Sequence, residues 1–250
     1  MRTLVYAHRG SSSEAPENTR AAFDKALEYA IDGIETDVQL SRDEVAVLWH
    51  DRFLGKLGMP ARHIDDFDLA ELRQMDFAAH FSPDAAPQGI MTLREFLESY
   101  RRRCRLLVEI KNRAWESHAR QQLKLRQTLE EIGAHEGEVI VSSFNLDSLV
   151  YAHQCAPEFS LVYNLETNQT MQDAERVLES HPFLCGLCLP IEILDAGIAG
   201  SLHAHGRIVA VYTCNSEDEI ARALALGVDI LISDMPHKAL RMRDAYEQVA

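Results

Sequence analysis

The stretch of sequence that decides the fold is Ala7-His8-Arg9-Gly10, Gly33-Ile34-Glu35-Thr36-Asp37-Val38 and His50-Asp51, read with the turns between these segments. Two histidines and two carboxylates stand here in segments whose other residues are typical of β-strands. Burying charged and titratable side chains costs free energy, so we expect these four residues to have a chemical task. The rest of the chain indicates where the strands lie relative to one another.

The first half of the chain alternates strand, helix and strand, and then changes character. Apolar residues recur at helical spacing from Glu17 to Ile31, with Asn18 or Thr19 as the expected cap. Residues 34–40 and 44–50 are typical of extended chain. Glycine and proline then accumulate over residues 51–91, which is too long for an ordinary loop. We therefore predict an insertion at about residues 52–91 that contains a helical turn or two.

A regular rhythm of helix and strand occupies the second half. The predicted helices are 93–102, 116–132, 146–155, 171–180, 194–204, 217–226 and 236–249, and the predicted strands are 105–110, 138–143, 159–163, 186–189, 208–214 and 229–232. Alternating strands and helices indicate a parallel sheet with helices outside. Roughly eight strand–helix units fit the chain, and eight units close a barrel. A doubly wound open sheet is the alternative, and no linker divides residues 1–250 into separate domains.

Composition narrows the class of protein. Lys and Arg total 25 against 39 Asp and Glu, a formal net charge of −14, which disfavours nucleic acid as a partner. No apolar run reaches the ~20 residues that span a bilayer, and the N-terminus lacks a secretory signal, so we expect a cytoplasmic protein without stable membrane insertion. The five scattered cysteines do not suggest a disulfide framework. A monomer and a homodimer both remain possible.

Ionisable residues at strand ends are the informative exceptions in a buried parallel sheet. Residues two apart share a face of a strand, so Glu35 lies with Asp37, and Glu109 with Lys111. Barrel active sites lie at the carboxyl ends of the strands, where these residues fall. Three carboxylates that converge from two strands form an oxygen site suited to Mg²⁺ or Ca²⁺. Two strand-end histidines, His8 and His50, could act there as general acid and base.

Each of these features also has a structural interpretation. A strand-end histidine is often only hydrogen-bonded, Glu35 and Asp37 could lie on a solvated edge strand, and Glu109 could form a simple ion pair with Lys111. Their coincidence at the same predicted end of three strands favours a site. By contrast, Cys185 and Cys188 are three apart on a strand and lack a second pair, so packing is preferred to zinc binding. His203 and His205 are expected at the surface.

Together these segments resemble the signature of glycerophosphodiester phosphodiesterases. The resemblance covers essentially the whole chain, in order. The matching motifs are His8-Arg9-Gly10, Pro16-Glu17-Asn18-Thr19, Ala22-Phe23, Gly33, Glu35-x-Asp37-Val38, His50-Asp51, Thr92-Leu93-x-Glu95, Glu109-Ile110-Lys111, Ser143-Phe144, Tyr212-Thr213-x-Asn215, Gly227-Val228-Asp229 and Ser233-Asp234-x-Pro236.

The resemblance implies a (β/α)8 TIM barrel with a small insertion after the second strand region. It implies that Glu35, Asp37 and Glu109 bind a divalent metal, Mg²⁺ or Ca²⁺, and that His8 and His50 form the acid–base pair. The substrate-binding residues that it implies are Arg9 and Lys111 on the phosphate oxygens, Glu17 and Asn18 at the rim or behind the site, and Phe144 and Tyr212 beside the substrate.

The chain departs from the family pattern at three places. Asp43-Glu44 stands where an Asp-Gly hairpin is usual, Leu54-Gly55-Lys56-Leu57 replaces an Arg-Thr-Thr run, and Tyr212 stands where Trp is common. A tyrosine ring can still form a wall of the glycerol pocket. None of the departures removes a proposed metal ligand or histidine, so they bear on substrate preference.

The expected activity is metal-dependent hydrolysis of a small-molecule glycerophosphodiester to glycerol 3-phosphate and an alcohol. The nucleophile is water, or the glycerol 2-hydroxyl acting through a cyclic phosphate. One alternative is a lysophospholipase-D-like or cyclising activity on larger lipids. Another is a barrel that binds phosphodiesters without turning them over.

Overall fold

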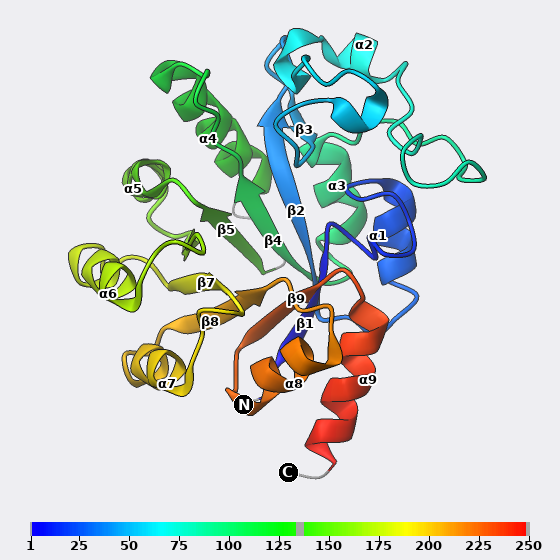
Figure 1. Cartoon of the computed structure of the whole chain (residues 1–250). Helices are drawn as coiled ribbons and strands as arrows, with labels where there is room; N and C mark the ends of the chain where they lie inside the picture. Colours follow the sequence, from blue (N-terminus) through cyan, green and yellow to red (C-terminus); the bar gives the residue numbers. More distant parts are fainter. Residues whose placement is uncertain (1, 134–137, 249–250) are drawn as a thin grey trace.

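Eight parallel strands close into a barrel in the computed structural model, which describes residues 2–133 and 138–248 (Figure 1). The strands are β1 (Leu4–His8), β2 (Gly33–Leu40), β4 (Arg105–Ile110), β5 (Val139–Ser143), β6 (Ser160–Asn164), β7 (Gly186–Pro190), β8 (Ile208–Tyr212) and β9 (Ile230–Ser233). Their order is β1-β9-β8-β7-β6-β5-β4-β2, and pairing of β1 with β2 closes the ring. The predicted (β/α)8 fold is confirmed, and the open-sheet alternative is wrong.

A helix follows each barrel strand and packs outside it (Figure 1). The helices are α1 (Arg20–Ala26), α3 (Leu93–Tyr100), α4 (His118–Ile132), α5 (Leu146–Cys155), α6 (Met171–Ser180), α7 (Ala196–Ala204), α8 (Glu217–Ala225) and α9 (Pro236–Glu247). The predicted bounds differ from these by a few residues, and residue 249 of the last predicted helix lies outside the described residues. One large hydrophobic cluster fills the layer between strands and helices.

The first helix is shorter than the predicted range 17–31. It starts after Thr19, whose hydroxyl accepts a hydrogen bond from the Ala22 backbone N–H, and it ends at Ala26. Asn18 is not the cap, because its backbone is left-handed (φ 55°) and its side chain donates to Asp37 instead. The helix therefore begins only after Asn18 has turned back toward the barrel.

The barrel interior changes from apolar to polar along its axis. A small buried cluster in the middle of the barrel contains Tyr6, Leu107, Val162, Cys188, Ala210, Ile230 and Ile232. Residues two positions further along a strand share the inward face, which brings His8 after Tyr6 and Glu109 after Leu107. The apolar layer thus supports a polar layer at the carboxyl ends.

The segment between β2 and α3 contains the predicted insertion. It begins with β3 (Ala46–Leu48), which pairs antiparallel with β2, and continues with η1 (Gly55–Leu57), η2 (Ile64–Asp66) and α2 (Leu69–Leu72). Its own hydrophobic cluster contains Val47, Trp49, Leu54, Ile64, Leu72, Phe77 and Ile90. Figure 1 shows this segment above the ends of β2 and β3, so it lies beside the barrel mouth.

The hairpin between β2 and β3 explains one departure from the family pattern. Glu44 has a φ of 62°, in the left-handed region that glycine adopts without steric cost. Glu44, a charged residue at the position where the family pattern usually has glycine, therefore adopts a backbone conformation that favours glycine.

None of the helices in the described ranges is both long and apolar enough to cross a membrane.

Candidate active site

Strand register brings the predicted site residues side by side. His8 at the end of β1 pairs with Glu35 on β2, and Asp37 on β2 pairs with Glu109 on β4. Neighbouring strands lie about 4.8 Å apart, so inward side chains at paired positions can touch. Register alone therefore places His8 beside Glu35 and Asp37 beside Glu109.

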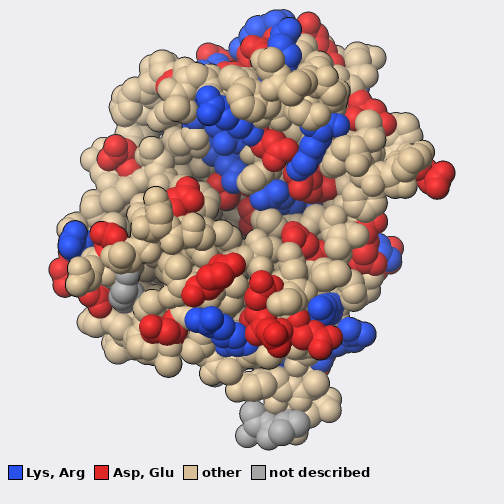
Figure 2. All heavy atoms as spheres, in the orientation of Figure 1, with Lys and Arg blue, Asp and Glu red and all other residues tan. Residues whose placement is uncertain are grey.

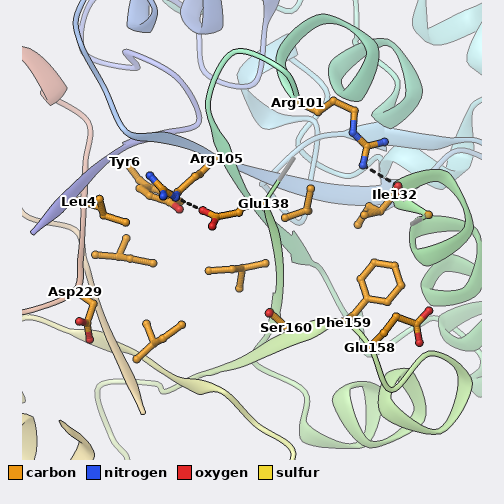
Figure 3. A pocket seen from close by; sticks show the side chains of 15 residues that line it. Leu4, Tyr6, Arg101, Arg105, Ile132, Glu138, Glu158, Phe159, Ser160 and Asp229 are labelled. Carbon is orange, nitrogen blue, oxygen red and sulfur yellow. Dashed lines mark hydrogen bonds and ion pairs between the residues drawn. The ribbon is translucent and has the colours of Figure 1, made fainter. Parts of the chain in front are cut away.

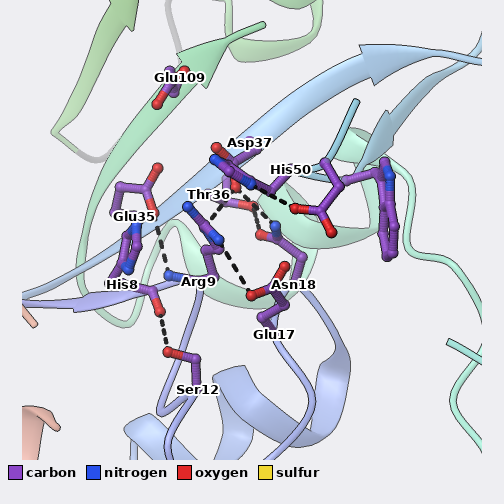
Figure 4. Close-up of polar contacts among 12 residues, drawn as sticks. His8, Arg9, Ser12, Glu17, Asn18, Glu35, Thr36, Asp37, His50 and Glu109 are labelled. Carbon is purple, nitrogen blue, oxygen red and sulfur yellow. Dashed lines mark hydrogen bonds and ion pairs between the residues drawn. The ribbon is translucent and has the colours of Figure 1, made fainter. Parts of the chain in front are cut away.

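The three carboxylates form one buried cluster. Oxygens of Glu35, Asp37 and Glu109 all lie within 4.8 Å of one another, and the residues are at most 8% exposed. Figure 4 shows Glu35 and Asp37 extending from one strand and Glu109 from its neighbour. Arg9 Nε lies 3.0 Å from Asp37 Oδ2, and Lys111 Nζ lies 2.9 Å from Asp37 Oδ1 and 2.5 Å from Glu109 Oε1.

The cluster holds more negative than positive charge. Burial raises the pKa of the Glu35 carboxyl well above its usual range, and the neighbouring Asp37 charge adds to the rise. Burial also opposes ionisation of Asp37, but the charges of Lys111 and Arg9 hold its pKa well below its usual range. Asp37 is thus ionised, whereas Glu35 lacks a counter-charge of its own.

A divalent cation fits this donor set. The three residues offer only oxygen atoms, which Mg²⁺ and Ca²⁺ prefer. The two positive charges of such an ion would offset the repulsion from Asp37 that adds to the raised pKa of Glu35. The cluster can therefore hold a metal ion.

His8 is fixed by a residue that the sequence did not single out as functional. Its Nδ1 donates a hydrogen bond to Asp234 Oδ1 at 2.6 Å, which directs Nε2 toward Glu35 Oε2, 3.9 Å away. Ser12 Oγ and Asn215 Nδ2 donate to the two oxygens of Asp234, at 2.9 and 2.6 Å. Ser233-Asp234 was quoted as a motif, but nothing in the sequence indicated that it would contact a histidine 226 residues away.

Electrostatics make this histidine neutral and its partner ionised. Burial lowers the pKa of His8, and the nearby Arg9 charge lowers it further. Burial alone would raise the pKa of Asp234, but the hydrogen bond from His8 brings it down to about 2. A neutral ring with its Nδ1–H on a carboxylate leaves Nε2 free to accept a proton.

His50 is held in a similar way from the other side of the site. Its Nδ1 donates to Asp51 Oδ1 at 2.9 Å. Its backbone carbonyl accepts from the Arg113 guanidinium. Gln39 Nε2 donates to the carbonyls of Trp49 and Asp51, at 2.7 and 3.0 Å. The loop that carries His50 is therefore tied to β2 and to the loop after β4.

A sharp turn after β1 aims Arg9 back into the site. Arg9 and Gly10 both have left-handed backbones, with φ of 56° and 85°. A Cβ on Gly10 would lie 2.5 Å from the Ala22 backbone, so only glycine fits there. The Arg9 side chain contacts Glu17 Oε2 at 3.2 Å, and its backbone N–H donates to Glu35.

Most of the predicted site residues line one cavity of about 170 Å³ at the barrel mouth. These are His8, Arg9, Glu35, His50, Glu109, Lys111, Phe144 and Tyr212. Glu17, Asn18 and Asp37 are not among the described lining residues. Asn18 Nδ2 donates to Asp37 Oδ2 at 2.9 Å, and Glu17 contacts Arg9, so both support residues of the site from outside the cavity.

Two rings form part of the cavity wall. The ring centres of Phe144 and Tyr212 are 6.0 Å apart at an interplanar angle of 84°. Lys111 Nζ lies 5.8 Å from the Phe144 ring centre, and the Tyr212 hydroxyl donates to the Leu165 carbonyl. The tyrosine hydroxyl is thus used within the protein, while its ring faces the cavity.

Other lining residues that the sequence did not predict as part of the site include Ser142, Asn164, Cys188 and Thr213. The first three lie on inward faces of β5, β6 and β7, where the apolar rule for parallel strands breaks. Cys188 is free and buried, and burial raises its pKa, so the expected packing role fits. His203 and His205 are exposed near the end of α7, as expected.

Figure 2 shows acidic and basic side chains gathered in the hollow in the middle of this face of the molecule, below the insertion. The acidic net charge of the whole chain therefore does not extend uniformly over the mouth. Cations and carboxylates meet there instead.

Comparisons with known proteins agree with this geometry. A family model described as the glycerophosphoryl diester phosphodiesterase family matches residues 8–238. Glycerophosphodiester phosphodiesterases from Caldanaerobacter subterraneus and Bacillus altitudinis are 32% and 30% identical, each over 97% of this chain and 98% of the relative. A solved Oleispira antarctica phosphodiesterase, in complex with the product sn-glycerol-3-phosphate, is similar with a TM-score of 0.86, 30% identity and 97% coverage of both chains.

The family match covers almost the whole chain, and both the closed barrel and the order of the motifs accord with it. The chain belongs to the glycerophosphoryl diester phosphodiesterase family and is a phosphoric diester hydrolase.

Proposed function

We propose that the protein hydrolyses small glycerophosphodiesters to glycerol 3-phosphate and an alcohol, with a divalent cation held by Glu35, Asp37 and Glu109. The observation that carries the proposal is the joint placement of these carboxylates and two histidines around one cavity. Each histidine is fixed by its own aspartate. That is the arrangement which general acid–base catalysis at a phosphodiester requires.

Arg9 and Lys111 hold the phosphate in this proposal. Both side chains line the cavity and also contact the carboxylate cluster, so they place positive charge between the cluster and the substrate. A guanidinium and an ammonium beside phosphate oxygens stabilise the charge that develops during displacement. A cation bound by these carboxylates would supply Lewis acidity toward the phosphate.

The two histidines move the protons. One takes a proton from the nucleophile through Nε2, and the other gives a proton to the departing alcohol oxygen. Asp234 and Asp51 keep each ring in the tautomer with Nδ1–H, so Nε2 is the atom that serves the reaction. Water and the glycerol 2-hydroxyl are both compatible nucleophiles.

The size of the cavity favours a small substrate over a larger lipid. About 170 Å³ accommodates a glycerol phosphate, and the rings of Phe144 and Tyr212 offer flat apolar walls to its carbon atoms. The Oleispira antarctica relative was solved with sn-glycerol-3-phosphate as its product. A lysophospholipid would have to leave its acyl chain outside the cavity.

One assay tests the proposal. Glycerol 3-phosphate release is measured from glycerophosphocholine, glycerophosphoethanolamine and glycerophosphoglycerol. Choline release, with lysophosphatidic acid as the other product, is measured from lysophosphatidylcholine. Each assay is run with and without chelator, and with Mg²⁺ or Ca²⁺ restored. We expect chelator to abolish turnover, one of the two cations to restore it, and the three small substrates to exceed the lysolipid. Chelator-resistant turnover would refute the metal dependence, and faster turnover of the lysolipid would refute the substrate class. Detection of cyclic phosphate distinguishes the two nucleophiles.

A further inference from the structure

Lys56, on the short helix η1 of the insertion, reaches back into the surroundings of the active site. Its Nζ lies 2.7 Å from Glu17 Oε1 and 3.1 Å from Asp51 Oδ2. The ammonium also lies 5.8 Å from the centre of the Trp49 ring. One cation thus bridges two carboxylates, from the loop after β1 and from the loop after β3.

Each of these carboxylates has its other oxygen on a residue of the proposed catalytic machinery. Glu17 Oε2 accepts from Arg9 NH1 at 3.2 Å. Asp51 Oδ1 accepts from His50 Nδ1 at 2.9 Å. A continuous chain of contacts therefore runs from Arg9 through Glu17, Lys56 and Asp51 to His50.

The two carboxylates need this cation to lie where they do. Potential ligand atoms of Glu17, His50 and Asp51 all lie within 4.8 Å of one another, so the carboxylates would repel each other without positive charge between them. Lys56 supplies that charge from within the protein. Without it, Asp51 is free to turn away from His50, and Glu17 from Arg9.

The insertion also holds Lys56 in place. Leu54, two residues before it, is fully buried in the hydrophobic cluster of the insertion, together with Trp49. The Lys56 side chain is 29% exposed and those of Glu17 and Asp51 are 15% and 31% exposed, so solvent screens the bridge only in part. A freely exposed ion pair contributes little, but this one is anchored and shared.

We propose that Lys56 is a positioning residue through which the insertion orients His50 and Arg9. It acts on His50 through Asp51 and on Arg9 through Glu17, without touching the substrate. The proposal rests on the catalytic roles proposed above for these two residues.

The test compares three variants at saturating metal. Lys56→Met keeps the length of the side chain and removes the charge, and Lys56→Arg keeps the charge. Lys25→Met is the control, because Lys25 in the last turn of α1 forms a similar surface ion pair, at 2.6 Å, with Glu28 after the helix, and neither residue lines the cavity. We expect Lys56→Met to lower kcat about 10-fold, part of the ~10²-fold that acid–base catalysis contributes. Lys56→Arg should keep most of the activity, and Lys25→Met all of it.

Two further measurements separate positioning from loss of structure. In Lys56→Ala, added ethylammonium should restore part of kcat, because a small cation can enter the space of the missing ammonium. In a His50→Ala background, Lys56→Met should have less effect than in the wild type, because the two substitutions then remove the same contribution. Wild-type kcat in Lys56→Met would overturn the proposal, as would a loss that neither arginine nor ethylammonium restores.

The outcome is distinguishable from failure of the proposed function. If the wild type shows no metal-dependent release of glycerol 3-phosphate, the proposed function is wrong. If the wild type is active, His50→Ala is inactive and Lys56→Met equals the wild type, only the role of Lys56 is wrong.

Discussion

The two ends of the barrel differ in the burial and the balance of their charged side chains. A hollow of about 560 Å³ opens at the amino ends of the strands, larger than the cavity of about 170 Å³ at the carboxyl ends. Figure 3 shows Arg105 paired with Glu138 in the larger hollow, beside Leu4 and Tyr6. At the carboxyl ends, three buried carboxylates face the cations of Arg9 and Lys111.

This difference shows that an excess of buried carboxylates indicates the reactive end of the barrel better than the volume of the hollow does. An ion pair at the surface is complete within the protein and needs nothing more. A buried cluster with more carboxylates than cations is stabilised by a ligand of opposite charge. Five substitutions test this contrast, from the largest expected effect to the smallest.

Removing one carboxylate from the cluster should have the largest effect. Glu109→Gln deletes a negative charge at the proposed metal site, and cation catalysis contributes several kcal/mol, so kcat/KM should fall at least ~10³-fold. The rise in Tm that Mg²⁺ or Ca²⁺ gives the wild type should shrink as well. Glu158→Gln at the amino-end hollow is the matched control and should change neither value.

Removing either histidine comes next. His8→Ala and His50→Ala should each lower kcat by at least ~10²-fold, because each ring transfers a proton in the proposed reaction. Metal affinity, measured by calorimetry, should change little. A variant that turns over at nearly the wild-type rate would remove its histidine from the mechanism.

Loosening His8 without removing it should have a smaller effect. Asp234→Asn removes the negative charge opposite the ring and one of the two acceptor oxygens that receive hydrogen bonds from His8, Ser12 and Asn215, so we expect kcat to fall about 10-fold. KM should stay close to that of the wild type, because Asp234 does not line the cavity. A rise in KM with unchanged kcat would argue against a role in orienting the ring.

The same residue gives a pH dependence of stability with a defined sign. The pKa of Asp234 is about 2 in the folded protein, below the ~4 of an unfolded chain. Its contribution to stability is therefore complete above about pH 4 and is lost as the pH falls from there to about 2. The free energy of unfolding of the wild type, measured in urea, should fall more steeply across this pH range than that of Asp234→Asn.

The smallest effect is expected at the amino end. Arg105→Gln breaks an exposed ion pair with Glu138, which should cost at most ~1 kcal/mol of unfolding free energy and leave kcat unchanged. Chemical denaturation and the glycerol 3-phosphate assay measure the two quantities. A large loss of activity would mean that the amino end also takes part in the function.

The sequence predicted the cluster of carboxylates and cations at the carboxyl ends, because residues two apart on neighbouring parallel strands lie close together in space. Glu35 and Asp37 are two apart on one strand, and Glu109 and Lys111 on the next, so alternation alone puts them on the inward face. Sequence spacing predicts the partner of one histidine but not of the other. Asp51 is adjacent to His50, whereas Asp234 reaches His8 only through closure of the ring.

The sequence did not predict contacts that depend on the path of irregular chain. The insertion shows few periodic signals, so the approach of Lys56 to Glu17 could not be inferred from spacing. Likewise, Arg9 and Asn18 have left-handed backbones, and that of Asn18 lies just before the start of the first helix, although neither residue type requires that conformation. Tertiary contacts select it in both places.

Pairing of β1 with β9 has a consequence for protein synthesis. The first strand made has no partner on one side until the last strand appears, and the hydrogen bond from His8 to Asp234 joins residues 226 positions apart. A nascent chain that has emerged only as far as β8 therefore carries both histidines and all three carboxylates, yet lacks the group that orients His8. Catalytic competence should consequently appear late on the ribosome, after most of the hydrophobic core has already formed.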